Sequence, residues 1–182
     1  RTLTLTAYGD MDVSRMPDKP PGRKPVDTRV ISMDRYAEVA QGLSNALQDG
    51  ARVYWVCPLV SESELIDLAA AEDRANALRT IYGDKVGLVH GQMKAADKDA
   101  VMARFAAGEI SILVATTVIE VGVNVPEATV MVIEHAERFG LAQLHQLRGR
   151  VGRGLDKSSC VLLYRGPLGE TAKARLGIMR ET

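Results

Sequence analysis

Hydrophobic residues along the chain fall into short, continuous runs that alternate with longer stretches of mixed polarity. The runs 112–115 and 130–133 are apolar at every position, which is typical of parallel strands that are covered on both faces. We expect strands near residues 29–31, 52–57, 85–89, 110–115, 129–133 and 160–164, and helices near 35–48, 64–80, 95–106, 141–152 and 172–179. Strands that alternate with helices in this way predict an α/β fold, doubly wound around a mostly parallel central sheet.

The N-terminal part of the chain does not follow this alternation of strands and helices. Residues 2–8 alternate between polar and apolar with a period of two, which predicts a strand. Residues 16–25 contain four of the seven prolines, and neither a helix nor a central strand tolerates that density. We therefore expect residues 1–15 to be the last strand or edge of a preceding unit, residues 16–27 to be an extended linker, and residues 28–182 to be the main domain.

Length and charge limit the classes of function. The chain has 182 residues, which suits one compact domain with its own core. Lys and Arg together number 23, as do Asp and Glu, so the net charge is zero. This balance excludes a histone-like partner and allows only a local basic patch. Aromatic residues make up 4% of the chain, which disfavours nucleic-acid binding on a sheet of stacking rings.

The cysteines bear on the presence of a metal site, and the lengths of the apolar runs bear on insertion into a membrane. Cys57 and Cys160 lie far apart in strand-like runs, no C-x-x-C occurs, and the chain has three His. We expect buried free thiols and no metal site. No apolar run is long enough to span a membrane, and the first residues do not resemble a signal peptide. A soluble cytoplasmic domain with no membrane partner is therefore expected.

Ligands of doubly wound sheets bind beyond the carboxyl ends of the strands. Three segments should meet at that edge: residues 90–94, residues 116–126 and the stretch that leads into 143–154. In the first, Gly91 would allow close approach of the backbone to a phosphate. His90 beside it is more simply explained by a structural role. The sequence predicts that any ligand site draws on these segments.

The helix expected over 141–152 has two unlike sides. One carries Gln146, Arg150 and Arg153, and the other carries Leu144, Leu147 and Val151. The paired guanidiniums suit phosphate oxygens and the charge that develops during phosphoryl transfer. A solvated polar face is the simpler alternative. Against it stand three glycines in or next to this helix (149, 152 and 154), since an interior glycine costs about 1 kcal/mol relative to alanine. Both interpretations remain open from spacing alone.

The segment after residue 115 is ambiguous in the same way. Thr117-x-x-Glu120 forms a capping box, which is the favoured account of Glu120. Thr116 could offer its hydroxyl and amide to a phosphate at a helix N-terminus. Gly122 and Asn124 suit a turn close to a ligand, but equally a turn alone. No G-x-x-x-x-G-K-[ST] occurs in the chain, so an arginine pair here would have to complete a phosphate site on another domain.

Three motifs together resemble a known family. Residues 146–153 (QLRGRVGR) are similar to motif VI of superfamily 2 helicases, residues 116–126 to motif V, and residues 90–93 to the motif IVa region. The stretches 54–64, 134–143 and 20–25 narrow the resemblance to the RecG-type ATP-dependent DNA helicases, over essentially the whole chain.

This resemblance implies the second RecA-like motor domain of a helicase that uses ATP to remodel branched DNA, such as stalled forks and Holliday junctions, in recombination and repair. The implied fold is a three-layer RecA-like domain. ATP and Mg²⁺ would be bound mainly by the preceding motor domain, which with a wedge domain lies outside this chain. The isolated chain would then be inactive, and the whole protein would be cytoplasmic and associated with the nucleoid through DNA.

The resemblance also implies roles for individual residues. Arg150 and Arg153 would be arginine fingers on the γ-phosphate of ATP. The nucleotide would further be contacted by Gln146, Gly122 and Asn124, where Asn124 replaces the Asp that relatives commonly carry. The DNA backbone would be held by Gly91, Thr116 and Thr117.

Two alternatives compete with this interpretation. One is a non-catalytic module of degenerate motor fold that binds phosphate or nucleic acid, and the intact pair Arg150 and Arg153 argues against it. The other is the motor of a transcription-repair coupling translocase. The proline-rich linker and the run 54–64 argue against that motor.

Overall fold

The computed structural model describes residues 26–59, 63–116, 128–149 and 158–181. Within them, six strands form one sheet in the order β1-β6-β5-β2-β4-β3, and every neighbouring pair is parallel. The expected α/β fold with a parallel central sheet is therefore confirmed. The strand expected over 2–8 and residues 16–25 of the expected linker lie outside the described residues, and the proposed domain boundaries stay predictions.

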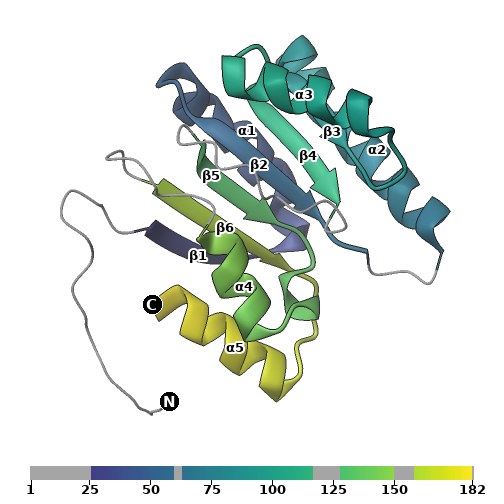
Figure 1. Cartoon of the computed structure of the whole chain (residues 1–182). Coiled ribbons are helices and arrows are strands. Elements are labelled where there is room, and N and C mark those ends of the chain that lie inside the picture. The colour runs from purple at the N-terminus through teal and green to yellow at the C-terminus, as the bar shows by residue number, and fades with distance from the viewer. Residues whose placement is uncertain (1–25, 60–62, 117–127, 150–157, 182) are drawn as a thin grey trace.

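The strands and helices follow one another in the expected order (Figure 1). The strands are β1 (Val26–Ser32), β2 (Arg52–Cys57), β3 (Val86–Val89), β4 (Ile112–Thr116), β5 (Ala128–Ile133) and β6 (Ser158–Tyr164). The helices are α1 (Tyr36–Gln48), α2 (Glu64–Tyr82), α3 (Ala95–Ala107), α4 (Leu141–Arg148) and α5 (Glu170–Glu181). Three short 3-10 turns, at Met33–Arg35, Gly83–Lys85 and Ala136–Arg138, complete the described elements.

Local sequence signals fix several of these boundaries. The hydroxyl of Ser63 accepts a hydrogen bond from the backbone N–H of Ile66 at 3.4 Å, which caps the N-terminus of α2. Gly108 ends α3 in the left-handed conformation, with φ at 91°, which a residue with a Cβ rarely adopts. Helix α4 was expected to reach residue 152. In the part of the chain that the structure describes, its last helical residue is Arg148 and Gly149 is its C-cap, and residues 150–152 lie outside the described residues.

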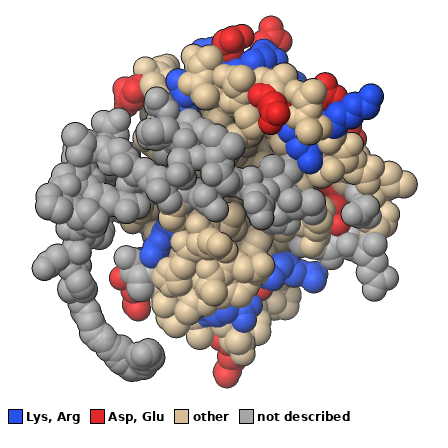
Figure 2. All heavy atoms as spheres, in the orientation of Figure 1, with Lys and Arg blue, Asp and Glu red and all other residues tan. Residues whose placement is uncertain are grey.

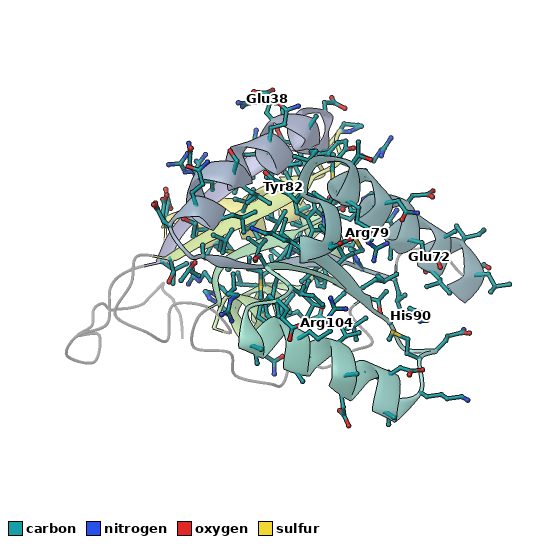
Figure 3. All side chains as sticks on the ribbon, turned by 90° about the horizontal axis from the view of Figure 1, so that it is seen from above. Glu38, Glu72, Arg79, Tyr82, His90 and Arg104 are labelled. Carbon is teal, nitrogen blue, oxygen red and sulfur yellow. The ribbon has the colours of Figure 1, made fainter. Side chains whose placement is uncertain are left out.

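Helices cover the sheet on both faces, which gives three layers (Figures 1 and 3). On one face, α1 and α2 bury Ala40, Leu43, Ala71, Ala75 and Leu78 against Val53, Trp55, Ile112, Val114 and Val132 of the sheet. On the other face, α3, α4 and α5 bury Phe105, Leu144, Leu176 and Met179 against Tyr54, Val56, Leu113, Met131 and Leu162. Consecutive strand residues thus pack into different layers, which explains why the strands are apolar without alternation.

Charges of both signs are interspersed over the described residues on the face shown in Figure 2. This distribution matches the zero net charge of the sequence. Among the described residues, none of the helices is both long and apolar enough to cross a membrane.

Candidate functional site

The parallel sheet brings the carboxyl ends of its strands to one edge. The registers show this for four neighbouring strands, β3, β4, β2 and β5: Val89 pairs with Ala115, Thr116 with Cys57, and Val56 with Ile133. The segments that follow β3, β4 and β5 therefore start from the same edge of the sheet, as the sequence predicted. The candidate site lies at this edge.

The turn after β3 supplies His90 and Gly91. His90 makes hydrogen bonds within the turn itself. Its side-chain Nδ1 accepts from the backbone N–H of Gln92 at 3.2 Å, and its backbone N–H donates to the sulfur of Met93 at 3.4 Å. Gly91 is exposed. Figure 3 shows His90 next to the start of α3. The imidazole therefore shapes the turn, as expected for a structural histidine, while the backbone of Gly91 is accessible to a ligand.

Thr116 is the last residue of β4 and is only 3% exposed. Its hydroxyl oxygen has no hydrogen-bond partner among the described residues. Buried polar atoms are nearly always paired, and leaving one unpaired costs about 1–3 kcal/mol. Functional sites are where groups that lower stability locally are retained, and this hydroxyl at the carboxyl edge is such a group. The structure thus places Thr116 at the carboxyl edge of the sheet, and its contact with a phosphate stays a prediction.

Helix α4 presents Gln146 to solvent. Gln146 is exposed, Leu144 is fully buried, and Leu147 packs against the same core, so the predicted division of this helix into two sides holds for its described part. Gln143 caps the helix, because its Oε1 accepts from the backbone N–H of Gly140 at 3.2 Å. Gln146 is thus the one residue of the predicted nucleotide-contacting set that the structure describes.

Arg148 lies at the end of α4 and is engaged inside the domain. Its Nη1 donates to the hydroxyl of Thr28 at 3.3 Å and to the carbonyl of Met179 at 3.0 Å, and its Nη2 lies 3.3 Å from Nδ1 of His145. Burial lowers the pKa of the Arg148 guanidinium. Burial, followed by the charge of Arg148, lowers the pKa of His145. These contacts give Arg148 a structural role that ties α4 to β1 and α5.

Several predicted site residues lie outside the described residues: Thr117, Gly122, Asn124, Arg150 and Arg153, together with Glu120 and Val151. Their assignments stay predictions. Within the described ranges, His, Cys, Asp and Glu side chains form no group of three that could hold a metal ion. Both cysteines are free and buried, as expected.

Sequence reasoning missed a buried carboxylate at the same edge. Glu134 directly follows β5 and is 5% exposed. It accepts from Nε of Arg74 at 2.6 Å and from Nη2 of Arg74 at 3.1 Å, from the indole N–H of Trp55, and from the thiol of Cys57 at 3.4 Å. Both carboxylate oxygens are therefore paired, and β2, β5 and α2 are joined through one side chain.

The charges of this cluster are balanced locally. Burial opposes the charged form of Arg74, but the hydrogen bond and charge of Glu134 raise its pKa overall. The pKa of the Cys57 thiol is raised well above its usual range by burial and then by the Glu134 charge, so this thiol stays protonated. The guanidinium carbon of Arg74 lies 3.7 Å from the ring centroid of Tyr36, the first residue of α1. A polar residue immediately after an apolar strand was the only sequence signal for this cluster.

The chain was compared with known proteins. The model of the family described as "Helicase conserved C-terminal domain" matches residues 36–154. The chain is 54% identical to the ATP-dependent DNA helicase RecG of Acidithiobacillus ferridurans and 53% identical to that of Escherichia coli K12, in each case over its whole length. It spans 27% of the length of these relatives.

Solved structures agree with this relationship. A structure of RecG bound to a three-way DNA junction matches 95% of the chain and 22% of that protein, with a TM-score of 0.75 and 44% identity. The E. coli DEAD-box protein SrmB matches 86% of the chain and 87% of its own length, with a TM-score of 0.58 at 17% identity, which supports the RecA-like fold alone. The chain therefore belongs to the family of helicase conserved C-terminal domains, in its RecG branch.

Proposed function

We propose that this chain is the second motor domain of an ATP-dependent helicase that remodels branched DNA in recombination and repair. The carboxyl edge of the sheet carries the proposal, because three features lie along it. They are the exposed residue Gly91, the Thr116 hydroxyl, which has no partner among the described residues, and the start of the segment leading to Gln146. The RecG relative bound to a three-way junction supports branched DNA as the substrate.

In this proposal the chain contributes to the ATP site from one side only. The sequence contains no phosphate-binding loop, and the described residues form no metal-binding group. ATP and Mg²⁺ would therefore be held mainly by the preceding motor domain of the whole protein. When bound there, ATP supplies the γ-phosphoryl group that is transferred to water. This chain supplies the amide of Gln146 and the fixed positive charges of Arg150 and Arg153, with Gly122 and Asn124 completing the nucleotide contacts.

The chemical role of the two arginines is electrostatic. A guanidinium presents a planar set of N–H donors to the oxygens of the transferred group and stabilises the charge that develops on them. The DNA contacts come from Gly91, Thr116 and Thr117 and are directed at phosphates. Binding to the DNA backbone is independent of base sequence and weakens as salt is raised.

The test uses the whole protein and junction-stimulated ATP hydrolysis. Loss of an arginine finger costs about 10³–10⁵ in turnover, so Arg150→Ala and Arg153→Ala should show losses of this size. Affinity for junction DNA should change little. Arg150→Lys should rescue poorly, because an ammonium lacks the planar fork.

Arg148→Ala is the matched control. Its guanidinium is occupied by Thr28 and Met179, so its loss should lower the free energy of unfolding but cost far less turnover in the folded protein than loss of either finger. Wild-type turnover in Arg150→Ala and Arg153→Ala would refute the finger assignment. A protein that binds junctions without any ATP turnover would support the non-catalytic module instead.

A further inference from the structure

The connection between β5 and α4 is held from both faces of the sheet. Its first residue, Glu134, is bonded to Arg74 and Trp55 on the side of α1 and α2. Its backbone N–H also donates to the carbonyl of Val56 at 2.9 Å, which extends the β5–β2 ladder by one residue. The connection therefore leaves the sheet from a fixed point.

Three residues further on, Glu137 is held from the opposite side. Its Oε1 accepts from the backbone N–H of Arg165, the residue after β6, at 2.9 Å. Its backbone carbonyl accepts from Nη2 of Arg175 in α5 at 3.0 Å. The side chain of Glu137 is 14% exposed, and the bond from Arg175 is partly buried. Glu137 thus ties the connection to β6 and α5.

The backbone between the two carboxylates is strained. His135 has φ of 50° and lies in the left-handed region, although it is not a glycine. A conformation of this kind costs about 1–3 kcal/mol and persists only where the surroundings enforce it. Here Ala136 and Phe139 are buried in the core cluster that contains Leu144 of α4. The turn is therefore held by polar bonds at Glu134 and Glu137 and by the buried side chains of Ala136 and Phe139.

We propose that the turn 134–138 is a two-sided anchor in which Glu137 acts as a positioning residue for α4. The inference rests on the proposed function, because α4 carries Gln146 and leads in sequence to Arg150. Interactions that matter only in the transition state are sensitive to small displacements, and an error of about 1 Å can cost about 100-fold in rate. Glu137 touches no substrate. It sets the direction in which α4 leaves the sheet edge.

The experiment measures kcat and KM for ATP in the whole protein with saturating junction DNA. Glu137→Ala should lower kcat by about 10- to 100-fold and leave KM within about twofold, because transition-state contacts are lost without loss of ground-state binding. Glu137→Gln keeps a side-chain oxygen for the Arg165 N–H, so it should recover most of kcat. Glu109→Ala is the matched control, since the Glu109 side chain is 64% exposed and pairs on the surface with Arg104. It should leave kcat unchanged.

A double-mutant comparison separates positioning from a general loss of stability. If Glu137 acts through the residues that α4 leads to, Glu137→Ala should lower kcat by less than about twofold in an Arg150→Ala background. A purely structural role would give the same loss in both backgrounds. Should Glu137→Ala fail to fold, Arg175→Ala removes the other bond to Glu137 and should show the same dependence on Arg150.

The two proposals fail in different ways. Near-normal turnover in Arg150→Ala would overturn the proposed function. If Arg150→Ala is slow, two results would overturn only the positioning role of Glu137. One is normal turnover in Glu137→Ala, and the other is an equal loss of kcat from Glu137→Ala in the wild-type and Arg150→Ala backgrounds.

Discussion

Removing the Arg74 guanidinium should be among the most destabilising single changes in this chain. Arg74→Ala deletes two hydrogen bonds to Glu134, at 2.6 and 3.1 Å, and the contact with the Tyr36 ring. Glu134 would remain buried, with Trp55 and Cys57 as its remaining side-chain donors among the described residues. Breaking one side of a buried ion pair costs about 3–5 kcal/mol. Because the Arg74 side chain is 17% exposed, we expect the lower end, about 3 kcal/mol.

Urea unfolding of the 182-residue chain, followed by circular dichroism, measures this loss. With a dependence on urea of about 2 kcal/mol per molar, a loss of about 3 kcal/mol lowers the midpoint by about 1.5 M. Arg35→Ala is the matched control, since Arg35 pairs with Glu38 on the surface, and its midpoint shift should be too small to resolve.

The double variant Arg74→Met with Glu134→Gln tests the reason for the loss. It removes both charges and leaves an amide oxygen for the Trp55 indole, so it should unfold at a higher urea concentration than Arg74→Ala. A double variant less stable than Arg74→Ala, or an Arg74→Ala midpoint equal to wild type, would refute the account of a paired, buried carboxylate.

Three further outcomes are expected. Thr116→Val should leave the free energy of unfolding unchanged or raise it by up to about 1 kcal/mol, because it removes a buried hydroxyl that has no partner among the described residues. The same variant should weaken junction-DNA binding by the whole protein, and a large loss of stability in urea would contradict the prediction. Gly87→Ala places its Cβ 2.7 Å from Ile110 Cδ1 and should destabilise by about 1–3 kcal/mol. Gly42→Ala in α1 should instead stabilise by about 0.5–1 kcal/mol, because the added Cβ meets no described atom within 4 Å beyond the adjoining helix backbone. Thermal melts of the two variants would show opposite shifts. Burial raises the pKa of Cys160 to about 12 and that of Cys57 well above its usual range. The unfolded thiols lose their protons from about pH 8.5, so stability should fall as pH rises from there toward 12, by about 1.4 kcal/mol per pH unit for each thiol; replacing both cysteines with Ala should flatten this dependence.

The order of the elements could be predicted because each one carries a local signal. The run 53–57 is apolar throughout, the segment 52–57 lies between Gly50 and Pro58, and β2 occupies the expected residues. The sheet also places Thr116 and Gly91 at the expected edge, because parallel strands share their carboxyl ends.

The Glu134 cluster could not be predicted from one sequence. Arg74 and Glu134 are 60 positions apart, and they meet because β5 lies next to β2 and α2 packs against β2, β4 and β3. Neither strand order nor helix placement follows from the pattern of apolar residues. The left-handed His135 was missed for a similar reason, since bonds from β6 and α5 to Glu137 hold the turn in place.

Single-turnover hydrolysis of bound ATP by the whole protein tests the central claim most directly. The claim is that this domain supplies transition-state charge to an ATP molecule held by its neighbour. With ATP and junction DNA pre-bound, Arg150→Ala should slow the hydrolytic step by about 10³–10⁵, while the Kd for ATP in the same sample stays within a few-fold of wild type. Hydrolysis of bound ATP at the wild-type rate by this variant would contradict the account.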